Sequence, residues 1–560
     1  MFKIFRPFAV LVASSALAMA VPAFATEEDL QTSATALVQA SWPSDGPGGA
    51  VIVTQAGEII YSGTQGLADI ESGRPITLDS VFRLGSITKQ FAAALVLKLA
   101  EEGQLSLDDP LSKFVPGYPE PGAHATVRQL LNHTSGIQSY TSIPGWMTAE
   151  NTSRAFTTAE LIAEFRDFPA QFEPGADHAY NNSGYILLAA VIEAVTGQPW
   201  HVVLEEQITG PLGLSSIRYG VGEEGMAERA LPYSRGPDGV IAAQPIHMSV
   251  PGPGGALVGS VRDLARWADA LHGGRVLQPE TYAQMIAPTQ LPGGRTVPYG
   301  YGISTGDLRG HDVIGHSGGI FGGLTDSIYI PERQLFVAVF VNTDVPQTIP
   351  GVVARRVAAM AVGNPFPALT AIPVDQGALE PYLGIYSVAN DDAEWRFSSR
   401  DGRLFMQQGA GTEQQILAAE GERFFYGPNS LTWYQGRQNG AGGVALDMHV
   451  NGSNEAVPMA RTGPIPSPPT VSREVLERYV GRYQLEGTVA TIGLTDDNRL
   501  TVQLTGQPGA SPLRTVGPNE FAGDAAGVRI TFEGDGPHAT RLISRIGPSV
   551  NSGARLDNGG

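Results

Sequence analysis

The segment from Ser86 to Glu102 (SITKQFAAALVLKLAEE) constrains this chain more than any other, because it is apolar on almost every face. A helix with apolar side chains all round is stable in water only when other elements enclose it. Gly103 ends the pattern. The sequence therefore predicts a buried helix whose first turn, which carries Ser86 and Lys89, lies at the edge of a hydrophobic core.

Strand-like segments stand at both ends of a helical region around this helix. Residues 50–61 (AVIVTQAGEIIY) predict a hairpin turning at Gly57, and residues 327–341 contain two β-rich runs. Between them, helical patterns cover residues 127–133, 158–165, 185–196 and 260–272, and a last helix is expected near 352–362. His133 is expected to close the first of these helices, near Gly136. This order predicts one sheet with helices packed on it.

The sequence pattern changes beyond Gly363. Helical patterns almost disappear there, and similar segments of sequence occur twice. Residues 379–386 (LEPYLGIY) recur as 476–483 (LERYVGRY), and residues 401–404 (DGRL) correspond to 497–500 (DNRL). Short alternating strands in two copies predict two small antiparallel barrels in tandem. We expect a first domain over 26–365, a linker over 366–378, barrels over 379–463 and 472–547 separated by a linker over 464–471, and a flexible tail over 548–560.

Composition narrows the classes of function. The chain has 560 residues, more than one core usually serves, and a net charge of -19, which argues against nucleic acid or anionic membrane as partner. It contains no cysteine, so disulfides, thiol nucleophiles and thiolate metal sites are excluded. No His-Glu-x-x-His pattern or histidine cluster at metal spacing occurs. We therefore expect no metal and no cofactor.

The N-terminus has the pattern of an export signal. Lys3 and Arg6 precede an apolar run over residues 8–21, and residues 23–25 (AFA) form a small-x-small cleavage site. A signal peptide over 1–25 predicts a periplasmic or secreted bacterial protein. The alternative is an uncleaved anchor, although the run is short for a membrane span. No later stretch is apolar enough to cross a bilayer, so no span is expected after cleavage.

The chain holds only four lysines, and one of them, Lys89, stands three residues after Ser86. Residues three apart on a helix share a face, so a hydroxyl and an amine would meet at its tip. A desolvated lysine gives up its proton whereas an arginine does not, which makes Lys89 a candidate general base for a Ser86 nucleophile. Taken alone, the spacing also fits a helix N-cap serine followed by a solvated lysine.

Two further patterns add to this pair. Tyr180-Asn181-Asn182 offers a phenol for proton transfer and an amide to orient its neighbours, although such runs also form plain turns. Residues 315–319 (GHSGG) precede strand-like sequence, where glycines would let a substrate approach and amides could face an oxyanion. The same residues fit the Gly-x-Ser-x-Gly elbow of α/β-hydrolases, with Ser317 as nucleophile. That elbow requires a helix directly after the serine, which the sequence does not show.

Residues from about 45 to 363 resemble the penicillin-recognising serine hydrolases, which include class C β-lactamases, DD-peptidases, D-aminopeptidases and related esterases. The three motifs of that family are matched in order by Ser86-x-x-Lys89, Tyr180-x-Asn182 and His316-Ser317-Gly318. Residues 126–136 (TVRQLLNHTSG) and 172–185 also resemble family sequence. The resemblance implies an α/β (α+β) domain of the β-lactamase/DD-peptidase type, with an antiparallel sheet flanked by helices. Two small lipocalin-like β-barrels following it are similar to those of bacterial D-aminopeptidase.

The resemblance also implies roles for the matching residues. Ser86 would attack the substrate carbonyl and form an acyl-enzyme, while Lys89 and Tyr180 would move the protons. Contacts with the substrate would come from Asn182, His316 and Gly318, and the oxyanion hole from the backbone amides of Ser86 and Gly319. The expected partner is a small molecule or a short peptide, and a homo-oligomer is left open. The barrels either shape the substrate site or only stabilise the protein.

The third motif departs from the usual Lys-Thr-Gly of the family, because His316 stands in the place of lysine. Histidine titrates near neutrality, so its charge would depend on pH unless it is a structural strand residue. The substitution argues against strong β-lactamase or DD-carboxypeptidase activity. A D-aminopeptidase-like enzyme is the leading expectation, with a carboxylesterase or a weak β-lactamase or DD-carboxypeptidase as alternatives. A peptidoglycan-binding or penicillin-binding protein without turnover is the alternative of another class.

Overall fold

The computed structural model describes residues 27–373, 376–389, 391–409, 411–438, 443–466, 469–507, 509–523, 528–534, 536–546 and 549–556. The export signal expected over residues 1–25 lies outside the described residues. The chain divides into two compact units, Met1–Phe366 and Pro367–Gly560. The first has its own hydrophobic clusters on both sides of a sheet, and the second has one cluster in each of two barrels.

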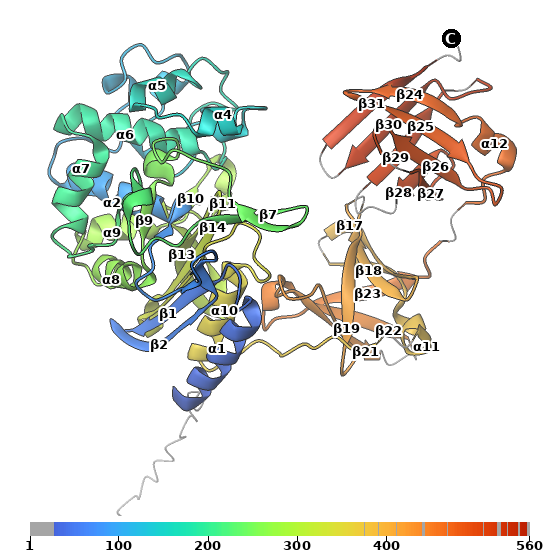
Figure 1. Ribbon diagram of the computed structural model, residues 1–560, viewed down its shortest axis with the longest axis horizontal. Coiled ribbons are helices and arrows are strands. Elements are labelled where there is room, and N and C mark those ends of the chain that lie inside the picture. Colours follow the sequence, from blue (N-terminus) through green and yellow to red (C-terminus); the bar gives the residue numbers. More distant parts are fainter. Residues whose placement is uncertain are drawn as a thin grey trace, which may run out of the picture. The chain divides into compact units, whose positions relative to one another are not determined.

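A six-stranded antiparallel sheet forms the centre of the first unit (Figure 1). Its strand order is β12-β13-β14-β15-β1-β2, and Ala50 of β1 lies opposite Phe340 of β15. This pairing joins the two ends of the segment, as the sequence predicts. The strands are β1 (Gly49–Gln55), β2 (Glu58–Gln65), β12 (Ser304–Leu308), β13 (His311–Ile320), β14 (Gly323–Ile330) and β15 (Leu335–Val341).

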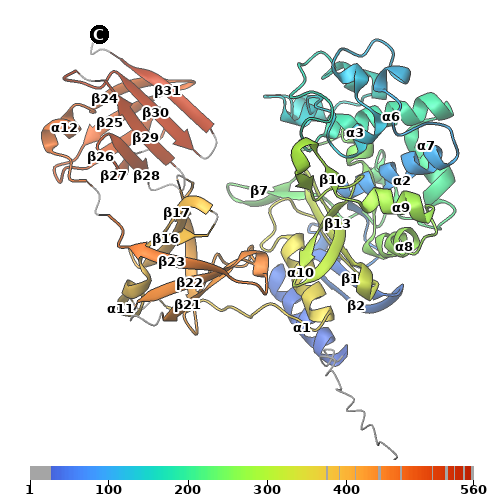
Figure 2. The same cartoon turned by 180° about the vertical axis from the view of Figure 1, so that it is seen from behind.

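Helices cover both faces of this sheet. On one face α1 (Glu27–Ser41) and α10 (Pro350–Ala361) pack on strand valines. On the other face, α8 (Val261–His272) contacts β1 and β15 as part of a larger core that includes α2 (Thr88–Glu101) and α6 (Asn182–Thr196). Figure 2 shows α1 and α10 side by side, apart from the other helices. The shorter helices are α3 (Val127–Leu131), α4 (Ala149–Thr152), α5 (Thr158–Ala163), α7 (Trp200–Leu204) and α9 (Pro279–Ile286).

The apolar helix expected from Ser86 is α2, and every residue from Thr88 to Leu97 is buried in it. Its beginning differs from the prediction, because Ser86 lies in a 3-10 turn (Gly85–Ile87) ahead of the α-helix and does not cap it. His133 follows α3 and its C-cap with a φ of 60°, so it does close that helix. The side chain of this histidine also reaches the candidate site described below.

Four smaller antiparallel sheets complete the first unit. They consist of β3 (Leu67–Asp69) with β4 (Arg74–Pro75), β5 (Phe82–Arg83) and β6 (Arg218–Tyr219) on either side of β9 (Leu257–Gly259), β7 (Tyr233–Gly236) with β8 (Gly239–Ala242), and β10 (Thr289–Gln290) with β11 (Thr296–Val297). Within the described chain no single helix is long and apolar enough to span a membrane. Only α6 combined with Trp200–Thr209 has the length and composition, and that pair is bent by 77°.

Each C-terminal repeat folds into a closed antiparallel barrel, as the repeated sequence predicts (Figures 1 and 2). The repeated motif makes the same hydrogen bond twice: the Tyr386 hydroxyl donates to Tyr382 O at 2.5 Å, and the Tyr483 hydroxyl donates to Tyr479 O at 2.8 Å. In both copies this bond ties the start of the first strand to the short helical turn before it.

The first barrel comprises β16 (Gly384–Val388), β17 (Asp391–Arg400), β18 (Arg403–Gln408), β19 (Gln414–Ala419), β20 (Arg423–Phe425), β21 (Trp433–Gln438), β22 (Val444–His449) and β23 (Val457–Gly463). The second comprises β24 (Gly481–Leu485), β25 (Thr488–Leu494), β26 (Leu500–Leu504), β27 (Ser511–Thr515), β28 (Glu520–Gly523), β29 (Val528–Glu533), β30 (Arg541–Ile546) and β31 (Ser549–Leu556). Short helices α11 (Gln376–Leu379) and α12 (Arg473–Glu477) precede them.

The flexible tail expected over 548–560 is wrong for most of its length. β31 pairs with β30 along the strand and meets β24 through Tyr483 and Arg555, which closes the second barrel. The polar sequence of this segment suggested a loose end. Alternate residues of a strand point to opposite faces, however, so a strand at a barrel surface needs few apolar residues.

Candidate active site

The turn that carries Ser86 packs directly against the end of β13. Gly85 has a φ of 54°, and a side-chain carbon there would lie 2.9 Å from the amide nitrogen of Gly319. A side-chain carbon on Gly318 would lie 2.1 Å from Leu84 O, closer than non-bonded atoms approach. Glycine is therefore required at both positions for the Ser86 turn and β13 to come together.

Ser86 and Gly319 line the same cavity, which has a volume of about 320 Å³. Asn182 and Gly254 also border it. Most of the other lining residues are apolar, and they include Tyr140, Met147, Ile246, Val250, Ile320, Phe321 and Leu324. A largely apolar cavity with a few convergent polar groups is typical of a site for a small molecule.

Lys89 is completely buried beside this cavity, and its amine has three polar neighbours. Nζ lies 2.6 Å from Gly254 O, 2.8 Å from Asn182 Oδ1 and 3.2 Å from Ser86 Oγ. Among the described lysines, ion pairs are formed by Lys98 and Lys113 at the surface, not by Lys89. Burial without a carboxylate lowers the pKa of Lys89 well below its usual value.

The three contacts of Lys89 match the bonding capacity of a neutral amine. A neutral amine has two hydrogens and one lone pair. The Gly254 carbonyl and the Asn182 amide oxygen can only accept, so they take the two hydrogens. When the amine is protonated, Nζ donates its third hydrogen to Ser86 Oγ; once the lowered pKa removes that proton, the lone pair is directed at the Ser86 hydroxyl.

Tyr180 is the third group at this point. Its ring lies 4.8 Å from Lys89 Nζ, and its hydroxyl is close enough to the Ser86 side chain to be influenced by it. Desolvation of the hydroxyl raises the pKa of Tyr180, and the Ser86 side chain opposes the rise. The residue as a whole is 42% exposed, so its ring remains open to solvent while its hydroxyl is shielded. At neutral pH the phenol therefore keeps its proton.

Asn182 is positioned by the start of α6. Its neighbour Asn181 is the N-cap, whose Oδ1 accepts a hydrogen bond from the Gly184 amide at 3.1 Å. This cap fixes the first turn of the helix, from which the Asn182 side chain reaches both Lys89 and Thr141. Its Nδ2 donates to Thr141 Oγ1 at 3.1 Å, which orients Oδ1 toward the lysine.

His316 lies on β13 but is buried away from the cavity surface. Its Nδ1 donates to Ser317 O at 2.5 Å, and its Nε2 accepts from the Tyr299 hydroxyl at 2.9 Å. Burial, and then repulsion by Lys89, lower the pKa of His316 to about 4. The expectation that its charge changes near neutrality is therefore wrong, because the imidazole is neutral over that whole range.

The structure thus brings Ser86, Lys89, Tyr180 and Asn182 into one cluster, with Gly318 and Gly319 along its edge and His316 one layer deeper. The alternative nucleophile Ser317 lies inside β13, opposite Asp326 of β14. A hairpin strand follows it and no helix does, so the elbow interpretation is wrong.

Sequence reasoning missed the aromatic layer behind Tyr180. The His133 ring lies 4.4 Å from the Tyr180 ring and 4.8 Å from the Tyr299 ring. His133 Nδ1 accepts a hydrogen bond from the Asn181 amide at 3.1 Å. A histidine directly after a helix in the TVRQLLNHTSG segment gave no signal beyond a helix end, and Tyr299 belongs to no motif.

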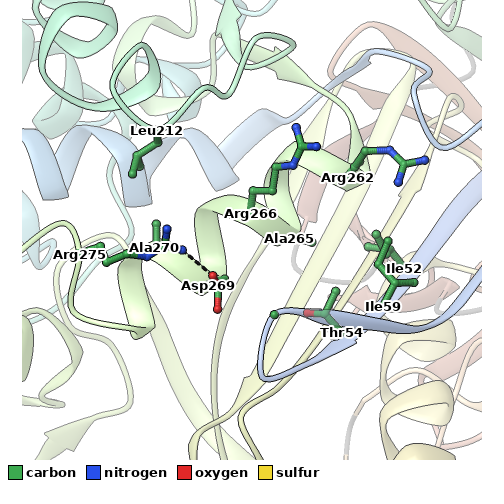
Figure 3. A pocket seen from close by; sticks show the side chains of 11 residues that line it. Ile52, Thr54, Ile59, Leu212, Arg262, Ala265, Arg266, Asp269, Ala270 and Arg275 are labelled. Carbon is green, nitrogen blue, oxygen red and sulfur yellow. Dashed lines mark hydrogen bonds and ion pairs between the residues drawn. The ribbon is translucent and has the colours of Figure 1, made fainter.

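A second cavity of about 320 Å³ lies elsewhere in the first unit (Figure 3). It is bordered by the β1–β2 hairpin and by α8, whose Arg262 and Arg266 point along its edge. Arg275 pairs there with Asp269 at 2.5 Å. Among the described residues no group of three or more histidine, aspartate or glutamate side chains is arranged to hold a metal ion.

Comparison with known proteins agrees with this geometry. The family model described as Beta-lactamase matches residues 35–361, which is more than half of the chain. The chain belongs to the beta-lactamase family. With the relatives described next, this membership shows a serine hydrolase whose family domain is the helix-covered antiparallel sheet described above.

Three curated relatives share this family domain. Penicillin-binding protein 4* of Bacillus subtilis is 26% identical over 402 residues, covering 67% of this chain and 87% of its own. The D-aminopeptidase of Brucella anthropi is 28% identical over 299 residues, covering 53% of this chain and 56% of its own. Esterase EstB of Burkholderia gladioli is 30% identical over 340 residues, covering 53% of this chain and 86% of its own.

A solved structure shows the same fold. The octameric penicillin-binding protein homologue from Pyrococcus abyssi has a TM-score of 0.53 and 23% sequence identity, and the match covers 78% of this chain and 99% of that one. At that identity the likeness concerns the fold alone. The relatives of this beta-lactamase-family hydrolase therefore include peptidases, an esterase and penicillin-binding proteins, so activity must be argued from the site.

Proposed function

We propose that this protein hydrolyses amide or ester bonds of small acyl or D-amino-acid compounds, in the manner of a D-aminopeptidase, through an acyl-enzyme on Ser86. The observation that carries the proposal is the buried amine of Lys89, whose Nζ contacts two carbonyl oxygens and lies 3.2 Å from Ser86 Oγ, so that its lone pair faces this hydroxyl once the amine has lost a proton. A serine becomes a strong nucleophile when a neighbouring base takes its proton as it attacks.

The first step transfers the Ser86 proton to Lys89 Nζ while Oγ forms a bond to the substrate carbonyl carbon. The carbonyl oxygen becomes an oxyanion, which the amides of Ser86 and Gly319 receive at the edge of the cavity. The tetrahedral intermediate then collapses, the C–N or C–O bond breaks, and the leaving amine or alcohol takes up a proton. Water attacks the acyl-enzyme by the same route and regenerates Ser86.

The pKa values of Lys89 and Tyr180, the two groups that carry protons, are shifted in opposite directions by their surroundings. Burial lowers the pKa of Lys89, so the amine is ready to accept a proton. Desolvation raises the pKa of Tyr180, so the phenol holds a proton that it can pass to the leaving group. Opposite shifts of two adjacent groups indicate a base and an acid. In this proposal Lys89 is the base and Tyr180 relays the proton to the departing atom.

The substrate class is inferred from the third motif and from the relatives. A neutral His316 in the third motif lacks the cation that would attract a substrate carboxylate, which favours amides or esters without a free carboxylate over a DD-carboxypeptidase substrate. A relative named D-aminopeptidase and one named esterase agree with either bond type. The signal pattern of residues 1–25 supports export to the periplasm or exterior.

Labelling with a serine-directed fluorescent phosphonate tests the nucleophile. The wild type and Ser317→Ala should be labelled at equal rates, and Ser86→Ala should not be labelled. Labelling that disappears in Ser317→Ala and survives in Ser86→Ala would contradict the proposal. Steady-state hydrolysis of D-aminoacyl p-nitroanilides and short p-nitrophenyl esters would then separate an enzyme from a binding protein, which gives at most one product molecule per site.

A further inference from the structure

The cavity beside Ser86 contains one carboxylate, Asp344, among its mostly apolar lining residues. Asp344 follows the end of β15 and lies near the turn between β13 and β14. The mechanism proposed above makes no use of it. An acidic side chain in an apolar substrate cavity is a costly feature unless something compensates its charge.

Two hydrogen bonds hold this carboxylate in place. Oδ2 accepts from the Gly322 amide at 2.9 Å, and Oδ1 accepts from the Ser234 hydroxyl at 2.7 Å. An ionised carboxylate has about four lone-pair positions, so these two neutral donors leave capacity for a further donor. The residue is partly exposed, which makes that remaining capacity accessible from the cavity.

Glu223, an acidic residue close to the same strand ends, is an example of a carboxylate whose charge is neutralised by neighbouring side chains. Its carboxylate lies 2.5 Å from Arg83 and 2.7 Å from Arg229, so two guanidinium groups neutralise it. The Arg83 side chain also donates to Phe321 O in the cavity wall, but its charge is directed to Glu223. Asp344 belongs to none of the ion pairs found within the described part of the chain.

We infer that Asp344 is a cation subsite, and that the enzyme selects substrates whose acyl part carries an ammonium group. The bound ammonium would donate to the free lone pairs of Asp344 while apolar walls enclose the rest of the acyl group. This inference rests on the proposed acyl transfer at Ser86, and it gives that site a substrate class: aminoacyl amides and esters rather than simple acyl ones.

Matched substrate pairs test the subsite. We would measure kcat/KM for the p-nitroanilides of D-alanine, β-alanine and 4-aminobutyric acid, and for the propionyl and butyryl p-nitroanilides that lack the amine. The substitution Asp344→Asn keeps the shape and an oxygen for Gly322 but removes the charge. For at least one amine-bearing substrate, kcat/KM should fall on the order of 10- to 100-fold, as for a lost charged hydrogen bond. The values for the neutral substrates should change less than about threefold, the margin for a retained fold.

A control variant separates charge from structure. Asp312→Asn removes the same charge from an exposed position on β13 and should keep the preference for amine-bearing substrates. Ser234→Ala removes one of the two hydrogen bonds that hold Asp344 but leaves its charge, so it should weaken that preference less than Asp344→Asn does. Equal losses on both substrate classes in Asp344→Asn, or no preference in the wild type, would overturn the subsite while leaving acyl transfer intact. A wild type that hydrolyses none of the substrates and resists phosphonate labelling would overturn the proposed function as well.

Discussion

Two cavities of the first unit have the same volume, about 320 Å³, and both lie beside basic side chains, yet their charges are arranged differently. In the cavity of Figure 3, three arginines border the space, and each pairs with an aspartate. Beside the Ser86 cavity, Lys89 is buried with only neutral oxygens around it. Cavity size therefore does not identify the site, whereas a buried ionisable side chain without a counter-ion does.

The difference has a physical reason. A cation paired with a carboxylate gains from staying charged, so the arginines of the second cavity are stable as ions and offer no chemistry. A charged amine surrounded only by neutral acceptors loses its hydration, and the hydrogen bonds to those acceptors do not replace it. The neutral form is therefore favoured and the amine releases its proton. The same burial that makes the charged form of Lys89 unfavourable makes the amine available as a base.

The largest effect is expected from Lys89→Arg. Arginine keeps a positive charge at this position but cannot act as a base in a protein, so kcat should fall by about 10²-fold or more. Lys98→Arg in the same helix is the matched control, because Lys98 is partly exposed and lies 3.7 Å from Glu102. Turnover near the wild-type value in Lys89→Arg would show that the reaction does not need the unpaired amine. The difference in charge pairing between the two cavities would then have no functional meaning.

A smaller loss is expected from Tyr180→Phe, which removes the phenol and leaves the ring. Lys89 would still take the serine proton, so kcat for anilide substrates should fall by about 10- to 100-fold. Esters with a good leaving group need little protonation and should lose less. Tyr282→Phe, at a tyrosine paired with His272 away from the site, is the control. An equal loss on anilides and activated esters would show that Tyr180 does not serve the leaving group.

Much of the fold follows from the sequence because local patterns and the repeat are strong. The apolar segment after Ser86 and the hairpin near Gly57 can be predicted from the pattern of their own residues. The two copies of the Leu-Glu-x-Tyr motif predict two barrels. Helix α1 was missed, although Leu30, Ala34 and Val38 stand at four-residue spacing and are all buried. Apart from Leu37, its remaining residues are polar or small, so the pattern was weak. Strand β31 was missed for the related reason that its sequence is polar.

The candidate site also has one part that the sequence predicts and another part that it does not. Ser86, Lys89, Tyr180 and Asn182 stand in motifs, so the sequence could name them before their distances were known. The sequence suggested a desolvated Lys89, but the contacts that surround its amine could not be predicted, because they come from segments far away in the chain. Gly254 O, the nearest neighbour of the lysine amine, belongs to no motif. His316 shows the limit most clearly: its identity suggested titration near neutrality, and its burial beside Lys89 prevents it.

The buried state of His316 predicts a pH dependence of stability. Its folded pKa of about 4 lies below the ordinary 6.5, so the unfolded chain binds a proton that the folded protein does not. This contribution is present above pH 6.5 and is lost as the pH falls toward 4. Between pH 7 and pH 5 the loss is about 2 kcal/mol. Urea unfolding of His316→Asn should show a correspondingly smaller loss, whereas His124→Asn, at a side chain that is 76% exposed, should behave like the wild type.

The smallest effect is expected from Arg275→Gln in the cavity of Figure 3. The Arg275 and Asp269 side chains are 56% and 44% exposed, so their ion pair is screened by water and contributes roughly 0–1 kcal/mol. Urea unfolding should shift by no more than that, and kcat/KM should stay within about twofold of the wild type, because no reacting group depends on this pair. A tenfold loss of kcat/KM would mean that the second cavity takes part in substrate binding. Charge pairing would then fail to distinguish the two cavities, and the identification of the active site would depend on the Ser86 labelling alone.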